Sequence, residues 1–282
     1  MGLTVPAYAK LNLTLEVLGK RPDGYHELHS LMCSLALHDS VRLELAPEIA
    51  VRCSLPELAG PGNLAHRAAF LLQAATNYQG GTMISIEKRI PVAGGLGGGS
   101  SDAAATLTGL NRLWDTGLSG EALGSLAAQL GSDVPFCLAG GVALASGRGE
   151  ILRPLPPLPP VTILLVHPPI QVSTASIYSA LTPDGYGDGM ASERLATLAY
   201  ATPPEEWPLV NALQPVTLRA YPLVGKVLEL LRDLGAAPVL MCGSGPTCFG
   251  FFETTERAKE GARTARDRGW EAWVTAPIGG QL

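Results

Sequence analysis

The sequence predicts an α+β protein built from two domains, and three observations carry this prediction. A glycine-rich loop over 94–99 separates an alternating strand at 82–90 from a helix, and this order is typical of a phosphate-binding unit. Five prolines between residues 153 and 160 form a stiff connector between domains. Beyond it, the hydrophobic pattern predicts strand, helix, strand, strand, helix and strand, which is the order of a ferredoxin-like domain.

Composition limits the class of protein. The chain has 282 residues, of which 46% are hydrophobic and 16% charged, so it can bury a sizeable core. The net charge of -5 argues against a nucleic-acid partner. Five scattered cysteines without a Cys-x-x-Cys pair argue against both a disulfide framework and a zinc site. Because there is no signal-peptide pattern and no apolar run of about 18 residues, we expect a cytoplasmic protein with no membrane partner.

Alternating side chains predict the strands of the first half. Residues 4–17 place leucines on one face and Lys10 and Asn12 on the other, as in a half-buried strand. Two further strands are predicted at 30–37 and 40–45. By this pattern alone, Lys10 is either a functional side chain or a solvated strand lysine, because lysine is rarely buried.

The turn Asp23-Gly24-Tyr25-His26 leads into these strands. Aspartate and glycine supply its turn chemistry. An aromatic ring beside an imidazole can stack on and hydrogen-bond the base of a ligand. The same pair can also be ordinary edge packing, and the local pattern leaves both interpretations open.

The loop from Pro91 to Ser101 is the strongest chemical signal in the chain. Glycines let backbone N–H groups approach a phosphate, and the start of the following helix attracts negative charge. The loop contains no lysine, which excludes a Walker A loop, and its glycine spacing excludes dinucleotide and protein-kinase loops. A flexible linker is the alternative, but a linker rarely lies between a patterned strand and a capped helix. We expect Ser101 or Asp102 to cap this helix, which continues to Trp114.

Two more helices and a turn complete the first half. One helix is predicted over 65–75, after Asn63, and a second from Ser119 to Gly131. Asp133 follows the second helix directly and can be a turn former, a helix cap or a functional carboxylate. The proline-rich segment predicts domains at 1–155 and 160–282, although such a segment can also be a polyproline motif for a partner.

The second half alternates between strands and helices. Strands are bounded by short turns, and an amphipathic helix opens at Pro222 and stops at Gly235. The predicted elements are a strand at 161–166, a helix at 173–181 capped by Ser173 or Thr174, a helix at 222–234, strands at 239–242 and 247–252, a helix at 254–268 and a strand at 270–275.

Taken together, the order of motifs is more specific than any one of them. Ala9-Lys10-Leu11-Asn12-Leu13, the turn at 23–26, the loop at 94–101, Gly131-Ser132-Asp133-Val134-Pro135 and Gly243-Ser244-Gly245 resemble the GHMP kinases, a superfamily of small-molecule kinases. Within it, the Asp-Gly-Tyr-His turn and the triple-glycine Ser-Ser loop resemble the family of 4-diphosphocytidyl-2-C-methyl-D-erythritol kinases. The resemblance covers essentially the whole chain.

This resemblance implies a fold, a reaction and a catalytic pair. The fold is an N-terminal ribosomal-protein-S5-domain-2-like ATP-binding domain followed by a ferredoxin-like domain. The reaction moves the γ-phosphate of ATP to the C2 hydroxyl of 4-diphosphocytidyl-2-C-methyl-D-erythritol, a step of the non-mevalonate route to isoprenoid (terpenoid) precursors. Asp133 matches the family's catalytic aspartate, which accepts the hydroxyl proton, and Lys10 matches the lysine beside it.

The resemblance also implies which residues bind the two ligands. For the substrate they are Asn12, Tyr25, His26, Thr174 and Tyr178. Magnesium is expected with ATP; its ligands are not assigned, with Ser100 or Ser101 as candidates. The ATP-binding residues implied are Asn63 and the loop, namely Pro91, Val92, Ala93, Gly94, Gly95, Leu96, Gly97, Gly98, Gly99, Ser100 and Ser101.

One segment departs from the family pattern, and two rival functions remain. Residues 211–214 read Asn-Ala-Leu-Gln where relatives carry Asn-Asp-x-Glu, so roles of those acidic side chains do not carry over. The first rival is another GHMP kinase of the mevalonate or homoserine type, which would not need Tyr25 and His26. The second is a catalytically silent nucleotide-binding module, which would not need Lys10 and Asp133.

Overall fold

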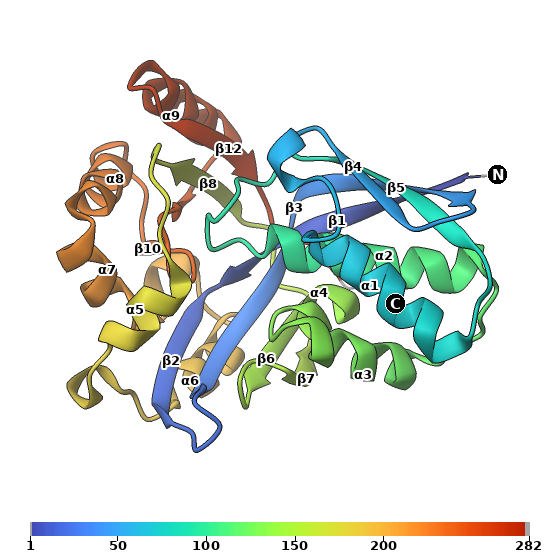
Figure 1. Ribbon diagram of the computed structural model, residues 1–282. Coiled ribbons are helices and arrows are strands. Elements are labelled where there is room, and N and C mark those ends of the chain that lie inside the picture. The colour runs from blue at the N-terminus through green and yellow to red at the C-terminus, as the bar shows by residue number, and fades with distance from the viewer. Residues whose placement is uncertain (1, 280–282) are drawn as a thin grey trace.

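The structure is a computed structural model that describes residues 2–279, and its first half is a mostly antiparallel sheet covered by helices (Figure 1). Within the described residues, no helix has the length and apolar character needed to cross a membrane. The elements of this half are β1 (Gly2–Asn12), β2 (Thr14–Lys20), β3 (His26–Ala46), β4 (Ala50–Cys53), α1 (Leu64–Thr76), β5 (Gly81–Glu87), α2 (Gly98–Leu113), α3 (Gly120–Leu130), α4 (Val134–Ala139), β6 (Val142–Ser146) and β7 (Ile151–Leu155).

Strand β3 is the centre of this sheet. It is 21 residues long and pairs antiparallel with β2 and β6 in its first part and with β1 and β5, on its two edges, farther along. Helices α1, α2 and α3 cover one face, where fully buried side chains such as Val41, Ile84 and Leu107 form one core. The helices predicted over 65–75 and from Ser119 are confirmed as α1 and α3. Their N-caps are Asn63, which accepts from Ala65 N, and Ser119, which accepts from Ala122 N.

The second half contains the predicted ferredoxin-like domain. Its four-stranded sheet has the order β10-β11-β8-β12 with antiparallel neighbours, so the first strand lies between the third and the fourth. Ser173, one of the two residues predicted as possible caps, is the N-cap of α5. The elements are β8 (Thr162–His167), α5 (Thr174–Ala180), α6 (Met190–Leu198), β9 (Val210–Asn211), α7 (Gln214–Ala220), α8 (Pro222–Asp233), β10 (Val239–Met241), β11 (Cys248–Phe252), α9 (Thr255–Asp267) and β12 (Glu271–Thr275).

The two halves are joined by more than the connector. The proline-rich segment runs between β7 and β8, but strand β9 of the second half pairs in parallel with β2 of the first. Leu15 and Val17 of β2 are buried in the same core as Val227 and Leu231 of α8. The site described below therefore lies where the halves are packed together.

Three local predictions were wrong. The strand expected over 4–17 is two strands that break at Leu13, and the strands expected at 30–37 and 40–45 are parts of the single strand β3. Helix α2 begins at Gly98 with Gly97 as its N-cap, not at Ser101 or Asp102. In that helix the Ser101 hydroxyl instead donates to the Tyr8 carbonyl, at 2.6 Å, because both side chains point into the protein and not toward the free N–H groups.

Candidate active site

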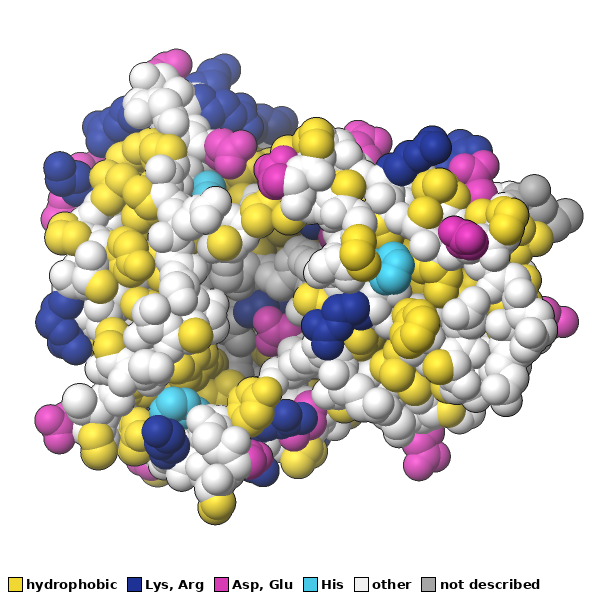
Figure 2. Space-filling view, viewed as in Figure 1, with side chains coloured by type: hydrophobic (Ala, Val, Ile, Leu, Met, Phe, Trp, Pro, Cys, Tyr) yellow, Lys and Arg dark blue, Asp and Glu magenta, His cyan; other side chains and the backbone are white. Residues whose placement is uncertain are grey.

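A single cavity of about 1190 Å³ collects the predicted site residues. It opens as a hollow between the two halves in Figure 2, with acidic and basic side chains visible inside it. Two of the predicted residues do not line it: Leu96 packs in the core and Ser101 is buried on Tyr8. Those that line it are Lys10, Asn12, Tyr25, His26, Asn63, Pro91, Val92, Ala93, Gly94, Gly95, Gly97, Gly98, Gly99, Ser100, Asp133, Thr174 and Tyr178.

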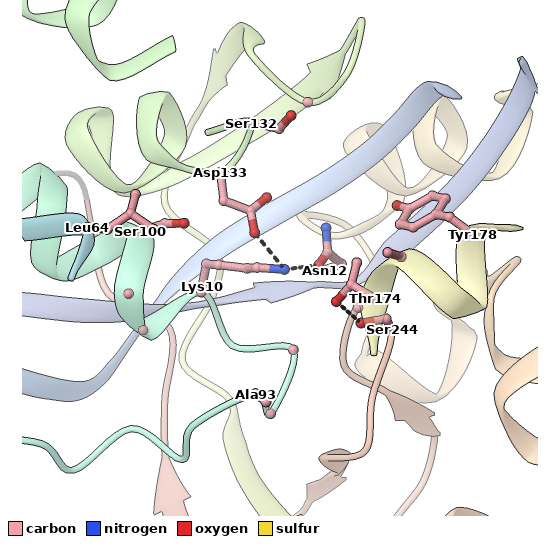
Figure 3. A pocket seen from close by; sticks show the side chains of 18 of the residues that line it. Lys10, Asn12, Leu64, Ala93, Ser100, Ser132, Asp133, Thr174, Tyr178 and Ser244 are labelled. Atoms are coloured by element: carbon pink, nitrogen blue, oxygen red, sulfur yellow. Dashed lines mark hydrogen bonds and ion pairs between the residues drawn. The ribbon is translucent and has the colours of Figure 1, made fainter. Parts of the chain in front are cut away.

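Lys10 and Asp133 form an ion pair at the centre of this cavity (Figure 3). Lys10 Nζ lies 3.6 Å from Asp133 Oδ2 and donates to Asn12 Oδ1 at 2.6 Å. Asn12 Nδ2 donates in turn to Ser30 Oγ, at 2.8 Å. Lys10 is buried, so it is not a solvated strand lysine, whereas the Asp133 side chain is 38% exposed and reachable by a ligand. A fixed cation beside an accessible carboxylate can stabilise and deprotonate a hydroxyl group.

Local structure explains how two residues 123 positions apart meet. Lys10 and Asn12 lie on the same face of β1, because side chains alternate along a strand. Asp133 precedes α4, yet it makes no side-chain cap with that helix. Its carboxylate instead pairs with Lys10, so Asp133 is not a side-chain helix cap, although it lies in the turn that precedes α4.

The glycine loop packs against Lys10 and against the second half. Lys10 N donates to Leu96 O at 3.0 Å. A Cβ atom on Gly97 would lie 2.8 Å from Lys10 Cγ, and one on Gly95 would lie 2.0 Å from the Cys242 carbonyl oxygen. Both glycines have positive φ, 69° and 78°, which only glycine adopts without cost. The loop ends at the N-terminus of α2, a helix of 16 residues, so free N–H groups and a positive dipole end face the cavity.

Tyr25, His26, Tyr178 and Thr174 gather at the other end of the cavity. The rings of His26 and Tyr178 lie 5.2 Å apart, and the Tyr25 ring is half-exposed. Burial, and then the charge of Lys20, lowers the pKa of His26, which favours the neutral imidazole that can both donate and accept. Thr174 Oγ1 and Ser244 Oγ share a hydrogen bond of 2.8 Å (Figure 3). This end offers rings and polar groups of the kind that bind a nucleobase.

A buried charge cluster beside the loop was not predicted. Lys88 Nζ forms ion pairs with Asp39 and with Asp102, the latter at 2.7 Å. Asp102 Oδ1 is buried without a hydrogen-bond partner among the described residues. Burial is the main cause that raises the pKa of Asp102 to about 7. The sequence gives no signal for this cluster, since its three members are far apart in the chain and Asp102 has the position of an ordinary helix cap.

Comparisons with known proteins agree with this geometry. Residues 63–141 match the family described as GHMP kinases N terminal domain, and residues 188–269 match GHMP kinases C terminal. A 4-diphosphocytidyl-2-C-methyl-D-erythritol kinase of Pelotomaculum thermopropionicum is 47% identical over 290 residues, covering 100% of both chains. The chain belongs to this kinase family. A relative of the same name from Geobacillus kaustophilus is also 47% identical, over 91% of this chain and 90% of its own.

Solved structures place the chain in the same family and show how widely its fold is shared. A crystal structure of a 4-(cytidine 5'-diphospho)-2C-methyl-D-erythritol kinase has a TM-score of 0.85 and 39% identity, covering 98% of this chain and 100% of that one. A homoserine kinase from Cytophaga hutchinsonii reaches a TM-score of 0.74 at 18% identity, covering 100% and 96%. At that identity the second likeness shows the fold alone, so the homoserine-kinase rival gains no support from it.

The segment that departs from the family pattern has a structural task. Asn211 Nδ2 donates to the carbonyls of Met241 and Gly243, at 2.8 and 2.7 Å. Gln214 Oε1 accepts from Met241 N at 2.9 Å. These amides hold the Gly243–Gly245 loop, and a Cβ on Gly243 would lie 3.4 Å from Lys10 Nζ. Asn211 and Gln214 therefore position the chain from Met241 to Gly243 beside Lys10.

Proposed function

We propose that the chain transfers the γ-phosphoryl group of ATP to the C2 hydroxyl of 4-diphosphocytidyl-2-C-methyl-D-erythritol, in the non-mevalonate supply of isoprenoid precursors. One observation carries the proposal. The Lys10–Asp133 pair lies in one cavity between a glycine loop and a cluster of rings, which provides a proton acceptor between a phosphate site and a nucleobase site. Full-length similarity to kinases of this name supports the same substrate.

Each group has a defined role in the transfer. The substrate oxygen attacks the γ-phosphorus, the bond from that phosphorus to the bridging oxygen of ADP breaks, and Asp133 accepts the hydroxyl proton. The Lys10 ammonium stabilises the negative charge that develops on the attacking oxygen, and Asn12 fixes its position. The backbone N–H groups of the loop and of the first turn of α2 hold the triphosphate. Tyr25, His26, Thr174 and Tyr178 hold the cytidine end.

Two binding roles rest on less direct contacts. Asn63 lines the cavity while its side chain caps α1 and donates to Leu58 O, so we propose that it shapes the adenine pocket through the position of that helix.

Magnesium supplies charge neutralisation of the phosphates when bound. No cluster of three or more acidic, histidine or cysteine ligands occurs among residues 2–279, which fits an ion held mainly by phosphates and water. Of the two candidate serines, Ser100 lines the cavity whereas the Ser101 hydroxyl is engaged by Tyr8, so Ser100 is the proposed protein ligand.

The domain limits at 1–155 and 160–282 stay a proposal, supported by the proline-rich segment between β7 and β8. A cytoplasmic location likewise stays a prediction from the five unpaired cysteines.

The decisive experiment compares substrates. Purified protein with ATP and magnesium is expected to release ADP with the cytidyl substrate and not with mevalonate or homoserine, as measured by a coupled ADP assay and by phosphorus NMR of the product. ADP release with mevalonate alone would overturn the proposed substrate, while the assignment to the GHMP superfamily would stand. Tight ATP binding with no ADP release on any of the three alcohols would instead favour the silent nucleotide-binding module.

A further inference from the structure

The turn between β6 and β7 forms the cavity wall between the catalytic aspartate and Tyr25. Arg148 and Gly149 of this turn line the cavity. On one side, a Cβ on Gly149 would lie 3.9 Å from the carbonyl oxygen of Ser132, the residue before Asp133. On the other side, the guanidinium carbon of Arg148 lies 4.7 Å from the centroid of the Tyr25 ring. The turn therefore spans the interval between the reacting end and the nucleobase end.

The Arg148 side chain is held in place with part of its guanidinium left open. Its Nε donates to Glu150 Oε1 at 3.2 Å, and the turn is fixed to β3 by Gly147 N, which donates to Glu27 Oε1 at 3.1 Å. The Tyr25 ring supports the flat face of the guanidinium. Among residues 2–279, neither Nη atom of Arg148 donates a hydrogen bond to the protein. An anchored guanidinium with two open nitrogens is prepared for a bidentate anion.

The other cations of the cavity are engaged or differ in kind. Lys10 is paired with Asp133, and Lys88 lies between two buried aspartates. Lys20 lines the same end as Arg148, but an ammonium on a flexible stem binds an anion as a point charge and not through a planar fork. Arg148 is thus the cavity's open guanidinium, and it lies where a chain from a reacting hydroxyl to a nucleobase must pass.

We infer that Arg148 binds the diphosphate of the substrate and is a specificity-determining residue for nucleoside-diphosphate-linked alcohols. The inference rests on the proposed function for the identity of the substrate. In this inference Arg148 recognises the negative charge of the substrate's diphosphate, whereas the aromatic rings recognise its base. An alcohol without a diphosphate gains nothing from this guanidinium, so Arg148 separates such alcohols from the substrate by affinity.

The test separates the diphosphate from the base by using CDP and cytidine as competitive inhibitors of the full-length enzyme. Arg148→Met is expected to raise the KM of the substrate and the inhibition constant of CDP about 10- to 100-fold, the loss of a charge-assisted hydrogen-bonded pair. The inhibition constant of cytidine and the KM of ATP should change by less than about 3-fold, since neither ligand uses the guanidinium. Arg148→Lys should recover part of the CDP affinity because it restores the charge but not the fork.

Arg153→Met is the matched control. Arg153 is exposed, pairs with Glu193 and does not line the cavity, so this variant removes the same charge without removing the proposed contact. An equal rise for CDP and cytidine in Arg148→Met would overturn the inference, because Arg148 would then only support Tyr25. Unchanged CDP affinity would overturn it as well. If the cytidyl substrate is not turned over by the wild-type protein, the proposed function fails, but the ratio of the CDP and cytidine dissociation constants, measured by direct calorimetric titration of wild type and Arg148→Met, still tests Arg148.

Discussion

The buried carboxylate of Asp102 makes the stability of this protein depend on pH in a direction that can be calculated. Burial raises its pKa from the ordinary 3.8 to about 7 in the folded state. Between these values the folded chain binds more protons than the unfolded chain, so the free energy of unfolding falls as the pH rises. Relative to the protonated group, the loss is roughly 2 kcal/mol at pH 5 and roughly 4 kcal/mol at pH 8. The difference, roughly 2–3 kcal/mol, is what Asp102→Asn should remove.

Urea unfolding of the wild type and of Asp102→Asn, followed by circular dichroism at pH 5 and pH 8 and at constant ionic strength, measures this difference in the free energy of unfolding. The comparison at pH 5 is the internal control. Replacing the carboxylate by an amide also changes stability through packing and hydrogen bonding, and this part of the change is the same at both pH values. Asp102→Asn should gain stability relative to the wild type as the pH rises. A difference that stays constant would show that this carboxylate does not titrate between pH 5 and 8. A change in the opposite direction would show that pairing with Lys88 outweighs burial.

Two further variants test the catalytic pair and the loop. Asp133→Asn should keep ATP affinity and lose turnover by at least ~100-fold, a typical general-base contribution, as read from kcat and from ATP titration; near-normal kcat would remove Asp133 from the mechanism. Gly97→Val places a Cβ 2.8 Å from Lys10 Cγ at a positive φ, so we expect ATP binding to weaken at least ~10-fold. Gly117→Val is the matched control, because Gly117 also has a positive φ, 66°, but a Cβ there meets nothing within 4 Å and the residue does not line the cavity; equal effects of both substitutions on ATP affinity would refute the packing argument.

Local patterns predicted most of the second half and the helices of the first. Apolar spacing predicted α8, and the order of strand and helix patterns predicted the ferredoxin-like domain. Helix α6, strand β9 and helix α7, which lie in the long connection between α5 and α8, were not predicted. The starts of α1 and α3 lie within one residue of the predicted starts, because the residues that cap them, Asn63 and Ser119, act within three residues of themselves. Lys10 and Asp133 could be paired only through the resemblance, since no local rule joins residues that meet through β1 and the start of α4.

The errors arose where a distant contact decides a local feature. Ser101 was read as a helix cap, but the Tyr8 carbonyl of β1 takes its hydroxyl, and the glycines before it complete the first turn of α2 instead. Asp102 was also predicted as a cap, yet its carboxylate pairs with Lys88, the residue that follows β5. The length of β3 was not predicted. Because different parts of this strand pair with four different strands, no single alternation of buried and exposed side chains continues along it.

The glycine loop does more than the sequence pattern suggested. Its lack of lysine excluded a Walker A loop, which raised the question of where the cation beside the phosphates comes from. Lys10 of β1 lies against the loop: its backbone N–H donates to the Leu96 carbonyl, and its side chain occupies the space that a Cβ on Gly97 would fill, so we propose Lys10 as that cation. The same side chain reaches Asp133. In the proposed function, phosphate binding and proton transfer therefore share one lysine, and we expect any change that moves the loop to move the partner of Asp133 as well.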